Sequence, residues 1–188
     1  MGWFIVLGLA AALILYLIVI YNNLVRLKHN VSRAWSNLDV LLKQRHDELP
    51  KLVDTCRRYM GYEQETLQKV LRARLAVHDA REKGDMKALG GAEEDLRKGL
   101  GRLMAVAESY PDLKANEEFL HLQDRISQLE NSIADRRELY NETVNLNNVR
   151  IEQFPDVMVA RNLGFKGFDL LHFSEEETAD VDVGALFQ

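Results

Sequence analysis

Hydrophobic residues follow two different patterns along this chain. The first pattern is an unbroken apolar run from Trp3 to Tyr21, and the first charged side chain after it is Arg26. At ~1.5 Å per residue, about 19 residues make a helix just long enough to cross a hydrocarbon core of ~30 Å. Trp3 and Tyr21 stand at the two ends of the run, where amphipathic rings prefer the headgroup level. The run therefore predicts a transmembrane anchor over residues 1–22.

Three other interpretations of the run are weaker. A cleaved signal peptide needs a basic start and a small-residue cleavage site, but Met1-Gly2 carries no charged side chain and large residues fill the end of the run. A lipoprotein signal needs a cysteine here, whereas the single cysteine is Cys56. A buried soluble helix is disfavoured because few such helices are apolar on every side for so long.

The charges beside the run predict its orientation. Arg26, Lys28 and Arg33 follow it closely, whereas the preceding residues carry only the α-amine. Because positive residues tend to stay on the cytoplasmic side, we expect the N-terminus outside and the remainder of the chain in the cytoplasm. One cysteine agrees with a reducing compartment.

The second pattern is a set of apolar stripes with helical spacing. Leu24, Val31 and Leu38 recur at seven residues, so the anchor helix is expected to continue to about Glu48 and to break at Pro50. Further helices are predicted from Pro50 to Glu82, Met86 to Ser109, Asn116 to Glu152, and, as a short piece closed by Gly164, Asp156 to Leu163.

Turn and cap residues separate these predicted helices. Lys83-Gly84-Asp85 and Tyr110-Pro111-Asp112 are expected to be turns, with Asp85 and Asn116 as N-caps. Glycines at positions 90, 91, 99 and 101 weaken the third helix, by ~1 kcal/mol each relative to alanine.

These elements predict an all-α fold, namely an N-terminal transmembrane helix followed by an antiparallel four-helix bundle with long helices. Alternation of β-branched residues is nearly absent, and short connections favour antiparallel neighbours. The bundle is expected over residues 23–173. Residues 174–188 include the acidic stretch EEETADVDV and are predicted to be a disordered tail.

Charge is distributed unevenly along the chain. Residues 26–81 hold 12 Lys and Arg against 7 Asp and Glu, whereas residues 82–188 hold 12 against 22. The first balance is +5 and the second −10, which together give the net charge of −5. A basic membrane-proximal part suits anionic lipid, and the acidic remainder argues against nucleic-acid binding.

The sequence offers little that indicates catalysis. None of the five histidines pairs with Cys, Asp, Glu or another His at a known zinc spacing, and no nucleotide-binding or nucleophile motif occurs. We therefore predict a protein that is not an enzyme and that has no metal and no cofactor.

Two polar features go beyond a plain bundle. Glu63 and Arg136 fall on apolar stripes, so we expect them to form a buried ion pair that fixes register, with Arg74 as a rival partner for Glu63. Asparagines also cluster late in the chain, with Asn22 and Asn23 near the membrane. Their amides set register in a helical seam, cap helix ends, bond across protomers or form a solvated polar face; the late members are Asn141, Asn145, Asn147 and Asn148.

Three segments carry a resemblance to the LemA family of bacterial membrane proteins. They are Tyr21–Leu67, Ala107–Asn148 and Phe154–Phe165, with a Tyr-Asn after the anchor, Leu-Pro-x-Leu-Val, Tyr-Pro-Asp-Leu-Lys-Ala-Asn and Arg-x-x-Tyr-Asn. The resemblance implies an antiparallel helical bundle behind one inner-membrane helix, with the bundle cytoplasmic and no known enzymatic activity. Relatives are often encoded beside membrane zinc metallopeptidases or TPM-domain proteins, which suggests a partner in membrane protein quality control.

The sequence is compatible with two functions. In the first, the protein is a membrane-tethered scaffold or adaptor that forms a homo-oligomer or holds a peptidase. Its anchors would pack through the small residues Gly8, Ala10, Ala11 and Ala12, which let helices approach closely. In the alternative, it is a lipid-binding or envelope-stress protein that acts on the bilayer and shapes it.

Overall fold

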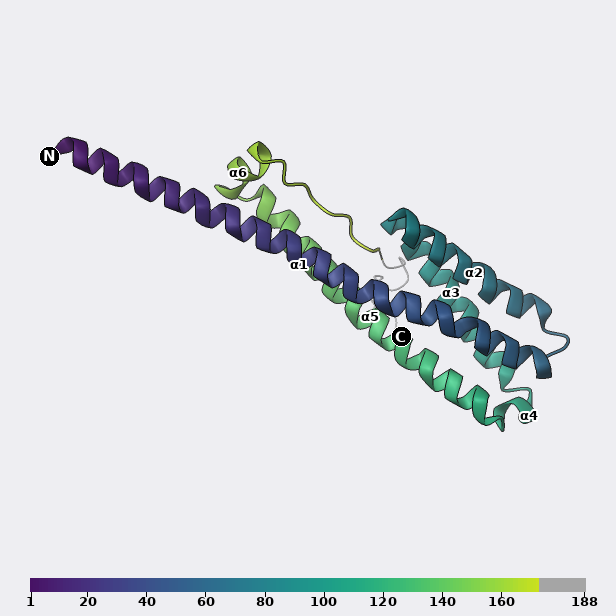
Figure 1. Ribbon diagram of the computed structural model, residues 1–188. Helices are drawn as coiled ribbons and strands as arrows, with labels where there is room; N and C mark the ends of the chain where they lie inside the picture. Colours follow the sequence, from purple (N-terminus) through teal and green to yellow (C-terminus); the bar gives the residue numbers. More distant parts are fainter. Residues whose placement is uncertain (173–188) are drawn as a thin grey trace, which may run out of the picture. The chain divides into compact units, whose positions relative to one another are not determined.

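The computed structural model describes residues 1–172, and this part of the chain is helical without any strand. Its helices are α1 (Gly2–Tyr59), α2 (Gln64–Lys83), α3 (Met86–Ala107), α4 (Pro111–Lys114), α5 (Glu117–Glu152) and α6 (Asp156–Asn162) (Figure 1). The predicted all-α fold with a long N-terminal apolar helix is confirmed. The predicted tail, residues 174–188, lies outside the described residues.

The chain forms two compact units. Residues 1–40 and 133–170 make one, here called the anchor unit, and residues 41–132 with 171–172 make the other, here called the bundle unit. Helices α1 and α5 contribute residues to both units. The predicted boundary at residue 22 falls inside α1, which runs through it without a break.

Helix α1 does not end near Glu48, as the sequence led us to expect, but continues through Pro50 to Tyr59. Proline has no N–H, so the carbonyl of His46, four residues earlier, loses its partner in the helix. Arg74 of α2 replaces that donor, because its Nε donates to the His46 carbonyl oxygen at 2.8 Å. The second helix consequently begins at Gln64 and not at Pro50.

The same arginine fixes the side chain of His46. Its Nη2 lies 2.7 Å from His46 Nε2, and the ring of His78 stacks nearby with a centroid distance of 4.7 Å. Burial, followed by the positive charges of Arg74 and His78, lowers the pKa of His46. The neutral ring accepts the arginine hydrogen bond on Nε2, which leaves the proton on Nδ1.

Helices α2 and α3 form a hairpin and lie side by side (Figure 1). Gly84 ends α2 with φ of 67°, a conformation that favours glycine, and the Ala88 N–H donates to the Asp85 carboxylate at 2.9 Å. The predicted turn and the predicted N-cap Asp85 are therefore confirmed. Asn116 likewise caps α5, since it accepts the Phe119 N–H at 2.9 Å.

Glycine in α3 serves close packing, and α3 runs from Met86 to Ala107 without interruption. A Cβ atom added to Gly90 would lie 2.6 Å from the carbonyl oxygen of His172. The segment at His172 can therefore rest on α3 only because position 90 has no side chain. Gly90 therefore has a packing role, and α3 is continuous despite its glycines.

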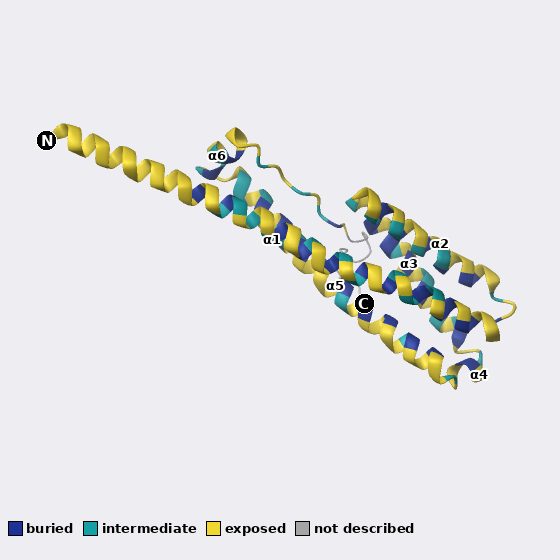
Figure 2. Ribbon diagram, viewed as in Figure 1, coloured by how far each residue is buried: buried dark blue, intermediate teal, exposed yellow. Residues whose placement is uncertain are grey.

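Buried side chains line one face of each helix in the bundle unit (Figure 2). Arg45 interrupts the apolar stripe of α1 and is only 1% exposed. It donates to Glu93 of α3, which is 4% exposed, and to Glu130 of α5, with Nη1 and Oε1 separated by 2.6 Å. One guanidinium thus joins three helices.

The charge on Arg45 is maintained by its partners. Burial alone lowers the pKa of an arginine, but the carboxylates of Glu93 and Glu130 outweigh it, so the pKa of Arg45 is raised. A buried charge requires such compensation, because an unpaired ion in the interior costs several kcal/mol. The ion cluster therefore fixes the register of α1, α3 and α5 within this unit.

Glu93→Gln should destabilise the protein by roughly 3 kcal/mol, because it leaves Arg45 buried with part of its charge uncompensated. Glu94→Gln is the matched control, since the neighbouring Glu94 pairs with Lys98 at the surface and should cost less than ~1 kcal/mol. Urea unfolding of the full chain in detergent micelles, followed by circular dichroism, measures both. Equal losses would show that the Arg45 cluster is not a buried constraint.

The link between Pro50 and Arg74 predicts a non-additive pair of substitutions. Arg74→Met should destabilise the wild-type chain by about 1–2 kcal/mol, because the His46 carbonyl loses its donor. In a Pro50→Ala background the cost should be smaller, since residue 50 then supplies the helical N–H. A double-mutant cycle of unfolding free energies measures the coupling, and strict additivity would refute the link.

Candidate functional site

The apolar segment of α1 is exposed to its surroundings from Trp3 to Val19, and the apolar side chains on every side of the helix share this exposure (Figure 2). Its most apolar window has a mean hydropathy of 2.8 with 6% of the window buried, and it is long enough to cross a membrane. Trp3 and Tyr21, the predicted anchor ends, are 72% and 44% exposed. The segment therefore has the length and composition of a membrane span.

The small residues predicted to pack anchors together lie on this exposed segment. Gly8, Ala10, Ala11 and Ala12 are all exposed, and a Cβ atom at Gly8 would meet nothing within 4 Å. Packing between anchors through these residues stays a prediction.

Helix α6 returns to α1 where the apolar run ends. Ala160 of α6 is buried together with Ile20 and Leu24 of α1, and Phe165 packs against the same cluster. The ring of Tyr21 meets that of Phe165 edge-on, with centroids 5.9 Å apart. This contact fixes α6 beside the last turns of the apolar run.

An ion pair and a proline turn lie at the start of α6. Asp156, at the first position of α6, is 2% exposed and accepts from Arg150 Nε of α5 at 2.7 Å. The Phe154–Pro155 peptide bond before it is cis. Gly164, with φ of 71°, ends the turn after α6, as predicted.

The chain after Gly164 is a strap, residues 165–169, held against α5 by side chains. Asn148 donates to the Phe168 carbonyl at 2.8 Å and accepts the Phe168 N–H at 3.0 Å. Tyr140 donates its hydroxyl to the Asp169 carbonyl at 3.0 Å. Two members of the asparagine cluster thus bind backbone of the same chain, because Asn147 donates to the Lys166 carbonyl at 3.5 Å.

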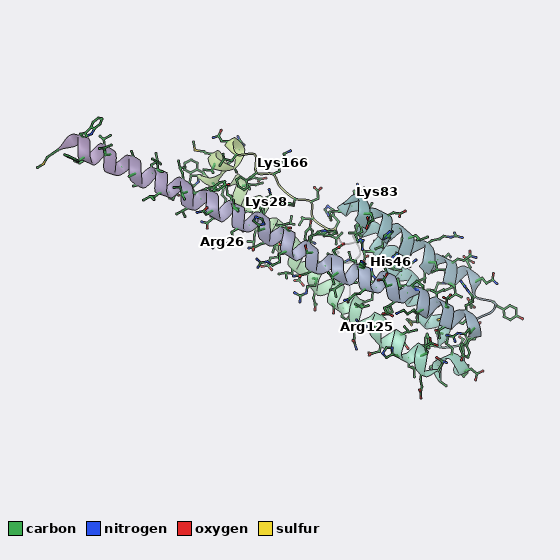
Figure 3. All side chains as sticks on the ribbon, in the orientation of Figure 1. Arg26, Lys28, His46, Lys83, Arg125 and Lys166 are labelled. Atoms are coloured by element: carbon green, nitrogen blue, oxygen red, sulfur yellow. The ribbon has the colours of Figure 1, made fainter. Side chains whose placement is uncertain are left out.

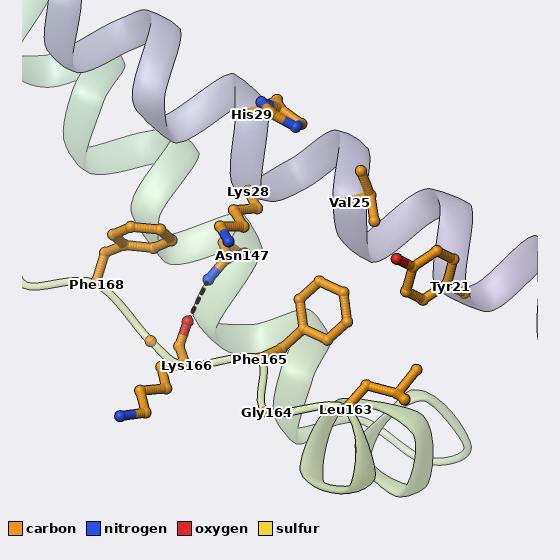
Figure 4. A pocket seen from close by; sticks show the side chains of 11 residues that line it. Tyr21, Val25, Lys28, His29, Asn147, Leu163, Gly164, Phe165, Lys166 and Phe168 are labelled. Carbon is orange, nitrogen blue, oxygen red and sulfur yellow. Dashed lines mark hydrogen bonds between the residues drawn. The ribbon is translucent and has the colours of Figure 1, made fainter.

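These contacts enclose a pocket of about 590 Å³ within the anchor unit (Figure 4). Its wall comes from α1, from the buried amide of Asn147 on α5, and from the turn and strap after α6. The lining residues are Tyr21, Val25, Lys28, His29, Asn147, Leu163, Gly164, Phe165, Lys166, Gly167 and Phe168. Two lysines and a histidine belong to this lining, which includes no carboxylate, and Figure 4 shows the Lys166 side chain extending away from Lys28.

The predicted basic flank is divided by this arrangement. Lys28 lines the pocket, whereas Arg26 and Arg33 are exposed on α1 and do not line it. Figure 3 labels Arg26 and Lys28 on α1 and Lys166 on the strap. Lys166 joins Lys28 from the strap, 138 positions later in the chain. Sequence reasoning missed Lys166 because no helical period connects the strap with α1.

The predicted burial of Glu63 and Arg136 as an ion pair is wrong. Arg136 is exposed on α5, and Glu63 is half-buried in the turn before α2, where it accepts from Thr66 at 3.5 Å. Arg74, the rival partner, is bound to His46 instead. Arg45 is buried instead, and it fits the three-and-four spacing of Leu38, Leu42 and Leu49 before Pro50.

Other chemistry is sparse in the described part. Residues 1–172 contain no group of three or more His, Cys, Asp or Glu side chains placed to hold a metal ion. Burial raises the pKa of Cys56 to about 11, so the thiol stays protonated at neutral pH.

The fold of residues 1–172 defines a class of protein, namely a helical bundle with one apolar helix able to span a membrane. A model of the LemA family matches residues 34–184, and the chain belongs to that family. It is 30% identical to the LemA protein of Metamycoplasma hominis over 167 residues, which cover 88% of this chain and 74% of the relative.

Magnetosome proteins are further relatives. The chain is 35% identical over 100 residues to magnetosome protein MamQ 1 of Paramagnetospirillum magneticum, and 31% identical over 105 residues to MamQ of Magnetospirillum gryphiswaldense. These alignments cover 53% and 56% of this chain but only 36% and 39% of the relatives. The chain therefore matches well under half the length of the magnetosome relatives.

Asn148→Ala should release the strap, because both hydrogen bonds to Phe168 are lost. We expect the Phe168 amide to exchange with solvent roughly tenfold faster, which corresponds to ~1.4 kcal/mol. Asn145→Ala is the matched control, since Asn145 is exposed on the same helix. Hydrogen exchange of the full chain measures both, and unchanged Phe168 protection in Asn148→Ala would contradict the role of the amide.

Proposed function

We propose that this protein is a non-enzymatic, membrane-tethered scaffold that assembles with itself or holds a membrane peptidase of protein quality control. In this proposal α1 spans the bacterial inner membrane once, with its N-terminus outside and the bundle in the cytoplasm. Membrane attachment is supported by the exposed apolar segment of α1. The orientation is supported by Arg26, Lys28 and Arg33, which follow that segment.

The observation that carries the scaffold proposal is an apolar surface on α5. Leu139, Leu146 and Val149 are 37%, 52% and 44% exposed, and they lie on the side of α5 away from the buried Tyr140 and Val144. Isolated exposed apolar residues are ordinary, but a set on one helix face favours an interaction surface. A second copy of the chain or a membrane peptidase is the occupant that we propose for it.

A second candidate function is action on the bilayer itself. The specific observation in its favour is the pocket with Lys28 and Lys166 beside the apolar segment. Cationic side chains at this level attract anionic lipid headgroups. The two functions differ in what accompanies the protein after gentle purification, which is protein in the first and lipid alone in the second.

The scaffold proposal predicts a complex much heavier than one protomer when the protein is purified gently from native membranes. Leu146→Glu with Val149→Glu should reduce it to the protomer mass, because charges on the α5 surface would have to be buried in the assembly. Light scattering gives the mass, and mass spectrometry identifies any co-purifying peptidase.

Leu120→Glu serves as the control, since Leu120 is similarly exposed, at 48%, on the part of α5 that belongs to the bundle unit. It should leave the mass unchanged. A wild-type protein that purifies as a lone protomer with lipid alone would overturn the scaffold proposal and favour the second candidate.

A further inference from the structure

We propose that the anchor unit binds one anionic phospholipid, with the headgroup phosphate between Lys28 and Lys166 and an acyl chain in an adjoining apolar groove. This inference rests on the membrane attachment in the proposed function and is independent of the scaffold. It assigns a ligand of defined chemistry to the pocket described above.

The groove is the first argument. It has a volume of about 530 Å³ and runs between the apolar segment of α1 and helix α6; its lining residues are Ile14, Leu17, Ile18, Tyr21, Met158, Val159, Asn162 and Leu163. Tyr21 and Leu163 line both this groove and the lysine pocket. A cationic cavity that continues into an apolar groove matches a molecule with an anionic head and an apolar chain.

The positions of the groove and the pocket along α1 match the positions of the acyl chain and the headgroup of a phospholipid in a bilayer. Ile14, Leu17 and Ile18 belong to the membrane-spanning run, so the groove lies at the level of the acyl chains. Lys28 follows Tyr21 by seven residues, which places its Cα roughly 10 Å further along the helix axis. Lysine ammonium groups reach back along apolar surface to the headgroups, so Lys28 can meet a phosphate there.

The charges of the pocket suit an anionic partner. Lys28 and Lys166 form no ion pair with any carboxylate of residues 1–172, and no Asp or Glu lines the pocket. A phosphate between two ammonium groups gains charge-assisted hydrogen bonds from both. Figure 4 shows Lys28 beside Asn147, which holds the strap in place, and the Lys166 side chain extending away from Lys28. The exposed Lys166 side chain therefore reaches the phosphate by turning toward the pocket.

Helix α6 supplies an apolar rim. Met158 of α6 is 59% exposed, and the flanking Phe154 and Leu163 are 81% and 58% exposed, although Ala160 of α6 is buried against Ile20 and Leu24. That packing fixes α6 at the level where the apolar run ends. Exposed apolar side chains at this level suit the boundary between headgroups and acyl chains.

Native mass spectrometry of the full chain in mild detergent tests the proposal with phosphatidylglycerol as the probe and phosphatidylcholine as the neutral reference. Wild-type protein should retain phosphatidylglycerol preferentially. Lys28→Ala with Lys166→Ala should lower its retention about tenfold, since two charge-assisted contacts are lost. Arg26→Ala with Arg33→Ala removes two positive charges from the same flank without touching the pocket, and it should change retention less than about twofold.

Glycerol 3-phosphate distinguishes a lipid site from a simple phosphate site. Because it lacks acyl chains, it should not displace phosphatidylglycerol at equal concentration. Equal losses in the two double variants would mean diffuse attraction to basic residues and would overturn the proposal. Displacement by glycerol 3-phosphate would overturn it as well, since the groove would then contribute nothing.

Separate readouts keep this inference distinct from the proposed function. All four substituted side chains are exposed, so each double variant should keep the wild-type circular dichroism spectrum and melting temperature. A wild-type protein that sediments with membranes and forms a heavy complex, but retains no phosphatidylglycerol, would refute only the lipid site. A wild-type protein absent from the membrane fraction would refute the membrane attachment and the lipid site together.

Discussion

The bundle unit depends on the cost of burying one positive charge. Arg45 is almost completely enclosed, and its guanidinium reaches Glu93 of α3 and Glu130 of α5. Apolar stripes tolerate sliding by a turn, because one leucine can replace another at a similar contact. A buried ion does not tolerate sliding, since any shift that separates it from its carboxylates leaves charge without compensation. Burial of the leucines therefore stabilises this unit, and the ion cluster selects one helix register among those that the leucines allow.

Sequence reasoning succeeded where a local rule determines the structure. Asp85 and Asn116 cap helices because a short polar side chain at that position satisfies a free N–H, and Gly84 and Gly164 end helices with positive φ. It failed where a distant residue changes the local outcome. Pro50 was expected to break α1, since nothing near it in sequence announces that Arg74 supplies the missing donor. Arg45 lies inside the expected first helix, but its partners Glu93 and Glu130 come 48 and 85 positions later, so no local pattern predicts its burial.

The candidate site shows the same division. Lys28 could be predicted as part of a basic flank, because it follows an apolar run in the sequence. The pocket around it could not, since its other wall is the strap, which has no periodic pattern and is held by amides that bond to backbone. An asparagine amide can accept from an N–H and donate to a carbonyl of the same residue, as Asn148 does with Phe168. Such paired hydrogen bonds hold an irregular segment in one backbone conformation, which cannot be predicted from composition.

The hydrogen bond from Arg74 to the His46 carbonyl also depends on the order in which the chain is synthesised. The chain is synthesised from its N-terminus, so Pro50 leaves the ribosome 24 residues before Arg74. During that interval the His46 carbonyl has neither a helical donor nor the guanidinium, and water is the donor that remains. The apolar segment can enter the bilayer in this period, while the helix beyond Pro50 still lacks its stabilising contact. In the membrane-tethered protein that we propose, the hydrogen bond to the His46 carbonyl forms only after α2 has been synthesised, and insertion of the apolar segment does not depend on it.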